Sequence, residues 1–152
     1  MIRRTMMPAG LVALLAVLGL TGCGGPAVQE PNGTPVTLSA EDLDAKFIHP
    51  EKREWYGWQR KGLSLAESGR YDEALYCFNR AVDAWPREMN DDSQRAKHKP
   101  EPTDTYLQKA ALYLKMDRPE LAIVYYDKFE AYFPGNRYAV EGRTKAQEML
   151  AE

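Results

Sequence analysis

Residues 58–86 read WQRKGLSLAESGRYDEALYCFNRAVDAWP. Large and small apolar residues recur in this stretch at spacings of three and four, which places them on one face of a helix. One such face begins at Trp58 and another at Ala74, and Gly69 lies between them. Glycine suits a left-handed turn, and small residues let two helix axes approach closely. The stretch therefore predicts two short antiparallel helices, the second ended by Pro86, which has no N–H to donate.

The same stretch resembles a tetratricopeptide repeat (TPR), whose pattern is W-x2-L-G-x2-Y, then A-x3-F and a closing proline. The matching residues are Trp58, Gly62, Tyr71, Ala74, Phe78, Ala81 and Pro86. Lys61 stands where the family usually has leucine, and Leu65 where it usually has tyrosine. The resemblance implies a right-handed stack of helical hairpins. A generic helical hairpin is the less specific interpretation.

A second copy of the pattern follows further along the chain. Tyr106 takes the place of Trp58, Lys109 that of Lys61, and Pro134 that of Pro86. Its second helix has an apolar stripe at helical spacing, made of Ala122, Tyr126, Phe129 and Phe133. Pro119 suits the first turn of that helix, whereas Phe129 departs from the family because it replaces the small Ala81. The two copies lie further apart than the family's period of about 34 residues, and the excess falls in residues 87–102.

The final helix is expected at 136–150, with Asn136 as its N-cap. Its apolar stripe would consist of Tyr138, Ala139, Gly142, Ala146 and Met149. Repeat arrays need a terminal helix with a polar outer face to cover the last apolar surface. We therefore expect this helix to cap the array.

The sequence thus predicts an all-α fold for residues 39–152, a short right-handed TPR-like solenoid of two repeats. The repeats are expected at about 52–86 and 103–134, with an inserted loop at 87–102 and the capping helix at 136–150. Lengthening a loop costs little free energy, so the insertion is either passive or an arm that contacts a partner. A short helix at 39–48 should precede the first repeat. Its expected supports are a Ser39–Asp42 capping box, a Leu38–Leu43 contact, docking by Phe47 and Ile48, and a stop at Pro50.

Residues 1–22 have the features of a signal peptide. Arg3 and Arg4 precede an apolar run over residues 9–20, which is too short to span a membrane stably. The run ends in Leu20-Thr21-Gly22-Cys23, which resembles the lipobox of bacterial lipoproteins. The resemblance implies cleavage before Cys23 and covalent attachment of diacylglycerol and acyl groups to it. The alternative is an ordinary secretory signal in which Cys23 is incidental.

Residues 23–38 are rich in glycine and proline, which predicts a lipidated, disordered and flexible tether rather than part of the domain. The mature protein would then be attached to a membrane. Gly24 rather than aspartate follows the cysteine. By the bacterial sorting pattern, this favours the outer membrane facing the periplasm, if the organism has one.

Composition and motifs give no indication of catalysis. The net charge of −2 shows no basic excess for nucleic acid. His49 and His98 are far apart in sequence, and Cys77 has no CxxC partner, so no metal site is expected. Cys77 is better explained as a packed thiol than as a nucleophile. We therefore expect a protein that is not an enzyme and that has no cofactor apart from the lipid on Cys23.

In the TPR family, the first helix of each repeat lines a groove that receives an extended peptide or a helix. The corresponding positions are Gln59, Leu63, Ala66 and Glu67 in the first repeat and Leu107, Ala111, Leu114 and Lys115 in the second. This candidate groove is mostly apolar with a polar rim. The alternative is that the 39–48 helix covers it as ordinary core. Further candidate contacts, because aromatic residues dominate interfaces, are Trp55, Tyr56, Tyr125 and Tyr132.

Together these features predict a membrane-anchored, TPR-like lipoprotein of the bacterial cell envelope. It would act as a protein–protein interaction adaptor for assembly, secretion, pilus or cell-wall machinery, with another envelope protein or peptide as its partner. The alternative is a structural accessory subunit or a peptidoglycan-associated lipoprotein without a groove ligand.

Overall fold

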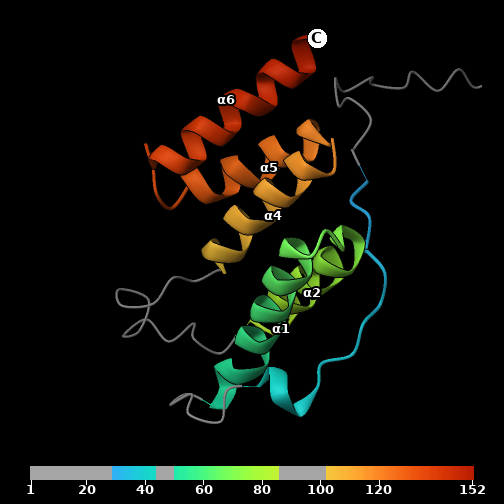
Figure 1. Cartoon of the computed structure of the whole chain (residues 1–152). Helices are drawn as coiled ribbons and strands as arrows, with labels where there is room; N and C mark the ends of the chain where they lie inside the picture. Colours follow the sequence, from blue (N-terminus) through green and yellow to red (C-terminus); the bar gives the residue numbers. More distant parts are fainter. Residues whose placement is uncertain (1–28, 44–49, 86–101) are drawn as a thin grey trace, which may run out of the picture.

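The computed structural model describes residues 29–43, 50–85 and 102–152. Its elements are the 3-10 helix η1 (Ala40–Asp42) and the helices α1 (Pro50–Glu67), α2 (Tyr71–Asp83), α4 (Thr103–Lys115), α5 (Pro119–Glu130) and α6 (Arg137–Ala151). These ranges contain no strand. The prediction of an all-α helical-repeat solenoid is therefore confirmed: two hairpins stack on one another and α6 lies at the end of the array (Figure 1).

The first repeat is the hairpin of α1 and α2. Gly62 on α1 lies against Phe78 on α2, whose ring is almost completely buried. Gly69 forms the turn with a φ of +75°, and the following amide, of Arg70, donates to the carbonyl of Leu65 at 2.9 Å. The helix ends at Asp83, and Pro86, predicted to end it, lies outside the described residues.

The second repeat, α4 and α5, reproduces this geometry with different residues. Asp117 takes the left-handed position of Gly69, with a φ of +57°, and Arg118 N–H donates to the carbonyl of Tyr113 at 2.9 Å. Pro119 begins α5, as predicted. The predicted stripe faces the core, with Ala122, Tyr126 and Phe129 buried and Phe133 packed against them.

The last helix, α6, packs on α5 as a cap, with Asn136 accepting hydrogen bonds from two amides of its first turn. Ala139 and Ala146 are fully buried, and Gly142 lies against the ring of Tyr126. The sequence predicts Tyr138 in the same stripe, but its side chain is 73 % exposed. Tyr126 of α5 fills the space beside Gly142, and Ala139 and Ala146, three residues before and four residues after Gly142, share the face that packs there.

The structure corrects the prediction of a flexible tether at 23–38 for the part that it describes. Residues 29–38 run extended along the first hairpin (Figure 1), and Thr34 N–H donates to the carbonyl of Asp72 at 3.0 Å. Val36 and Leu38 pack against the core. Glycine and proline here produce a bound extended chain rather than a free one, because that chain finds hydrogen-bond and ion-pair partners on the helices.

The segment that follows agrees in part with the predicted helix at 39–48. The Ser39 amide donates to Asp42 at 2.7 Å, which confirms the capping box. Leu38 and Leu43 both lie against Gly57 of α1. Only residues 40–42 are helical, however, and Pro50 begins α1 instead of ending an earlier helix.

Some predictions fall on residues that the structure does not describe. These are the signal peptide at 1–22, Cys23 and the tether as far as residue 28, Phe47 and Ile48, both histidines, and the inserted loop at 87–101. No helix in the described ranges is both long enough and apolar enough to cross a membrane.

Candidate functional site

A small groove lies between α1 and α4, the first helices of the two repeats. It encloses about 200 Å³ and is lined by Leu63, Ala66, Glu67, Phe78, Gln108, Ala111, Leu112 and Lys115. The structure therefore brings together Leu63, Ala66, Glu67, Ala111 and Lys115 of the predicted groove. Leu63 is 38 % exposed, although it is a large apolar residue.

Three of the predicted groove residues do not line this groove. Gln59 is buried, and its side-chain amide donates to the Thr105 hydroxyl at 3.4 Å, so it links α1 to α4 instead. Leu107 and Leu114 are half-buried against the core. All three predictions follow from the family's pattern, whereas the packing of α1 and α4 turns these side chains toward the core.

Conversely, sequence reasoning missed Phe78, Gln108 and Leu112. Gln108 could have been found, because it precedes Ala111 and Leu112 by three and four residues on the same helix. Phe78 reaches the groove from α2, across the position where Gly62 has no side chain. Within the described part of the chain, the side-chain oxygen of Gln108 is buried without a hydrogen-bond partner.

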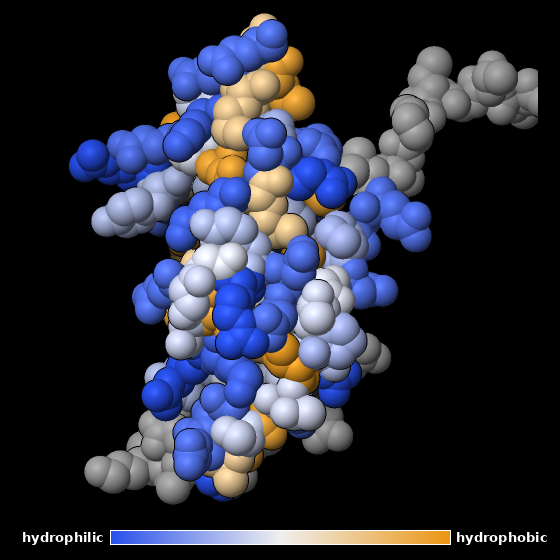
Figure 2. Space-filling model, turned by 45° about the vertical axis from the view of Figure 1, so that its right-hand side comes forward, coloured by the Kyte–Doolittle hydropathy of each residue, from blue (hydrophilic) through white to orange (hydrophobic). Residues whose placement is uncertain are grey.

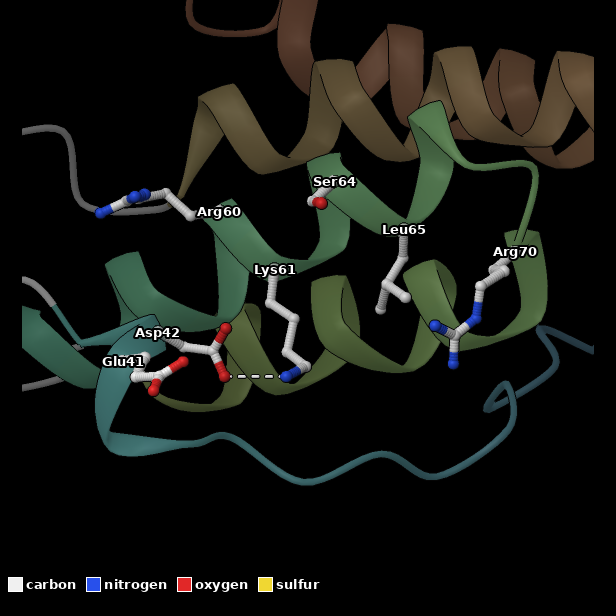
Figure 3. A pocket seen from close by; sticks show the side chains of 7 residues that line it. All are labelled: Glu41, Asp42, Arg60, Lys61, Ser64, Leu65 and Arg70. Carbon is white, nitrogen blue, oxygen red and sulfur yellow. Dashed lines mark hydrogen bonds and ion pairs between the residues drawn. The ribbon is translucent and has the colours of Figure 1, made fainter.

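The alternative that the 39–48 segment covers the groove does not hold for its described residues. Residues 39–43 lie on another surface of α1, where Lys61 Nζ forms an ion pair with Asp42 at 2.8 Å. Figure 3 shows these two side chains pointing toward one another in a polar pocket, with Arg60 and Arg70 at its two ends. On the face shown in Figure 2, apolar residues form small separate patches among hydrophilic ones.

The aromatic candidates have different environments. Trp55 packs edge-on against Trp85, with the ring centroids 4.6 Å apart, and Tyr56 lies under Arg60. Tyr132 is 37 % exposed. Tyr125 is buried and so is not a surface contact. Its hydroxyl instead belongs to a polar cluster around Lys109.

This polar cluster surrounds Lys109, which is only 2 % exposed. Its Nζ lies 2.6 Å from Asn79 Oδ1 and 2.7 Å from the Tyr125 hydroxyl, and it forms an ion pair with Glu30. Tyr113 donates its hydroxyl to Glu30 at 2.7 Å. One sequence signal points to this cluster: a lysine lies in the apolar stripe from Tyr106 to Tyr113, and a buried lysine needs a partner.

Burial and charge pairing shift the pKa values of Glu30 and Lys109 in opposite directions. Burial raises the pKa of Glu30, but the charge of Lys109 and hydrogen bonds from Lys109, Tyr125 and Tyr113 outweigh it, so the net pKa lies below its usual value. Burial lowers the pKa of Lys109 to about 8, although Glu30 opposes the shift. Burial, and then the hydrogen bonds to Glu30, raise the pKa of Tyr113 and of Tyr125. At neutral pH the cluster is a carboxylate held by an ammonium and two phenol donors.

Two further kinds of site, a metal site and a reactive thiol, can be examined in the described residues. They contain no group of three or more histidine, cysteine or acidic side chains that could hold a metal ion. Cys77 is fully buried, and burial raises the pKa of its thiol to about 11. This agrees with the prediction of a packed rather than a reactive cysteine.

Comparison with known families gave a match to each hairpin. A family model described as tetratricopeptide repeat matches residues 55–84, and a second model with the same description matches residues 103–134. The searches of curated proteins and of solved structures gave no match. The two matches agree with the predicted repeats and with the hairpins α1–α2 and α4–α5.

Proposed function

We propose that this chain works on a bacterial membrane, to which Cys23 attaches it. It contains two tetratricopeptide repeats, which indicate a protein–protein interaction adaptor. Its partner would be an envelope protein that places a short apolar segment in the groove between α1 and α4. The observation that carries the proposal is this groove, which combines both repeats into one site.

The lining of the groove suggests what the segment should contain. Leu63, Ala66 and Ala111 supply accessible apolar surface above the buried Phe78 and Leu112, which favours an apolar side chain on the partner. The side-chain oxygen of Gln108 is buried without a hydrogen-bond partner among the described residues, and rotation of this side chain toward the groove would let it accept a hydrogen bond from a partner N–H. Glu67 and Lys115 bring charges of both signs to the lining, so polar groups of either sign can flank the apolar anchor.

The membrane part of the proposal rests on the lipobox-like residues 20–23. A cysteine that carries two or three acyl chains gives lasting attachment, because each buried CH₂ contributes about 0.8 kcal/mol. Gly24 favours the outer membrane facing the periplasm by the same resemblance. The partner would then be found within the cell envelope, in assembly, secretion, pilus or cell-wall machinery.

Crosslinking in cells tests the groove. A photoreactive amino acid at Leu63 or at Ala111 should capture one and the same protein, because the two positions line the groove from α1 and α4. The same probe at Tyr138, exposed on α6, should not capture it. Ala111→Arg should abolish the adduct from Leu63, whereas Val140→Arg on α6 should leave it unchanged. An adduct that survives Ala111→Arg, or none at all, would contradict the groove and favour an accessory subunit without a groove ligand.

Metabolic labelling with a fatty acid tests the anchor. The wild-type protein and the Cys77→Ala variant should be labelled, and Cys23→Ser should not. The chain has two cysteines, so the pair of variants distinguishes them. Label that persists in Cys23→Ser would refute lipidation at that residue.

A further inference from the structure

Two lysines at equivalent positions of the two repeats bind the same N-terminal segment. Lys61 and Lys109 both occupy the position where the family usually has leucine. Lys61 pairs with Asp42 and Lys109 pairs with Glu30, so the two ion pairs lie at opposite ends of residues 30–42. Both lysines depart from the family pattern for the same structural reason, which is that each forms an ion pair with residues 30–42.

The site around Glu30 engages both oxygens of its carboxylate. Lys109 and Tyr113 donate to Oε1, and Tyr125 donates to Oε2. Asn79 accepts from Lys109 at 2.6 Å. Its side-chain amide also donates to the carbonyls of Pro31 and Asn32, at 3.4 Å each. The ammonium and phenols recognise an anionic group, and Asn79 extends recognition to the backbone that follows it.

Between the two ion pairs the chain approaches α2 very closely at Gly33. A Cβ on Gly33 would lie 2.2 Å from the carbonyl oxygen of Asp72 and 2.5 Å from the backbone nitrogen of Tyr76. Gly33 also has a φ of +80°, which favours glycine. Thr34 then donates its amide to Asp72 at 3.0 Å. Charge, backbone conformation and hydrogen bonding thus all fit this segment to this surface.

We propose that Lys109, Tyr113, Tyr125 and Asn79 form a carboxylate-binding site, separate from the apolar groove, whose ligand is Glu30 of the same chain. The site holds residues 29–38 on the repeats as a bound peptide. The folded domain therefore begins close to Cys23 in sequence rather than at residue 39.

The consequence for membrane attachment rests on the proposed lipidation of Cys23. With Glu30 bound, the chain from Cys23 can span at most about 25 Å, at about 3.5 Å per residue. With the chain free as far as Leu38, it could span about 50 Å. The site thus restricts how far the repeats and their groove can move from the membrane surface.

Amide hydrogen exchange on the full mature chain tests the site. Thr34 should be protected in the wild type, and Glu30→Gln should accelerate its exchange by about tenfold or more, because a hydrogen-bonded charge is lost. Exchange of Ala81, buried in α2, serves as the control for local unfolding of the repeat. Glu41→Gln, an exposed change in the same segment, should alter neither amide. Unprotected Thr34 in the wild type, or equal Thr34 exchange in Glu30→Gln, would overturn the proposal.

Two further measurements distinguish loss of Glu30 binding from general destabilisation of the domain. Tyr113→Phe removes one donor without leaving a buried charge unpaired, and should accelerate Thr34 exchange less than Glu30→Gln does. A synthetic peptide of residues 27–38 should bind the Glu30→Gln chain, whose site is vacated, and bind the wild type more weakly. The same peptide with glutamine at position 30 should fail to bind. Equal binding of both peptides would show that the site does not recognise a carboxylate.

The reach can be measured on vesicles that carry the lipidated protein. Energy transfer from a dye at residue 152 to acceptor lipids should differ between the wild type and Glu30→Gln, with a broader distance distribution in the variant. Identical distance distributions in the two proteins would show that Glu30 binding does not restrict how far the repeats move from the membrane. If Cys23 carries no lipid, the proposed membrane attachment fails, and the exchange and peptide results still decide the Glu30 site.

Discussion

Gly62 lies directly against the ring of Phe78. A Cβ at residue 62 would be 2.6 Å from Phe78 Cε1 and 3.2 Å from the Cβ of Cys77. Phe78 is 1 % exposed and is one of the residues that line the groove between the repeats. The absence of a side chain at residue 62 therefore lets Phe78 pack directly against α1 beside the candidate binding site.

The first prediction follows from this contact. Gly62→Ala should lower the free energy of unfolding by about 1–2 kcal/mol, because overpacking of a filled core outweighs the gain in helix propensity. Ser64→Ala, an exposed change two residues further along α1, should leave stability unchanged or raise it slightly. Urea titration followed by circular dichroism measures both variants. A Gly62→Ala protein as stable as the wild type would mean that Phe78 can shift at little cost.

A second prediction concerns the turn inside each repeat. Gly69 and Asp117 occupy equivalent positions with positive φ, and a Cβ at residue 69 would meet nothing within 4 Å. Placing aspartate at residue 69 or glycine at residue 117 therefore tests the effect of backbone strain on stability. Asp117→Gly should stabilise the protein by about 0.5–1 kcal/mol, and Gly69→Asp should destabilise it by a similar amount. Thermal unfolding of the two variants should shift the melting temperature in opposite directions, and shifts of the same sign would refute strain as the cause.

The sequence predicted the helices and the two hairpins well, since these depend on local spacing. The packing of the first repeat can be predicted directly from the spacing of Trp58, Gly62 and Phe78. The sequence could not predict the course of residues 29–38. Glycine and proline suit a free linker and a bound extended chain equally, and only tertiary contacts such as Glu30 to Lys109 decide between them. The family's pattern also predicts Gln59, Leu107 and Leu114 in the groove, but the packing of α1 and α4 in this chain differs from that pattern at these positions.

A third prediction concerns pH. The folded-state pKa of Glu30 lies below the ordinary value of 4.5, so its stabilising effect is complete above pH 4.5 and is lost as the pH falls through the lower, folded-state value. Of the groups around it, Lys109 stays charged in this range, and the raised pKa values of Tyr113 and Tyr125 keep the phenols protonated. Attachment of residues 29–38 should therefore persist at pH 5–7 and weaken below pH 4.5.

The measurement is the amide shift of Thr34 in a pH titration by nuclear magnetic resonance. Asp83 faces Lys109 across the same site, and Lys128 lies over the Tyr125 ring. Asp42 also has a lowered pKa: burial raises it, but Lys61 and Ser39 outweigh burial. Glu30→Gln should therefore remove the main transition at Thr34, and Asp42→Asn only a smaller one. A Thr34 transition that is unchanged in Glu30→Gln would assign it to another acid.

The last prediction uses thiol reactivity to compare the core with the groove. Cys77 has a pKa of about 11, raised by burial, so very little of it is thiolate at pH 8. In a Cys23→Ser background, Leu63→Cys should present an ordinary thiol in the groove. Cys77 should react more than about 100-fold more slowly than this thiol, from the difference in thiolate fraction alone.

The same probe then reports on the groove when a partner is present. Bound protein should protect Leu63→Cys from the thiol reagent, and leave Tyr138→Cys on α6 as reactive as before. The ratio of the two rates cancels any general effect of the partner on reagent access. Protection at both positions would place the partner on α6 as well as in the groove. Protection at Tyr138→Cys alone would move the interaction surface to the capping helix, and the groove would then be only a feature of how α1 meets α4.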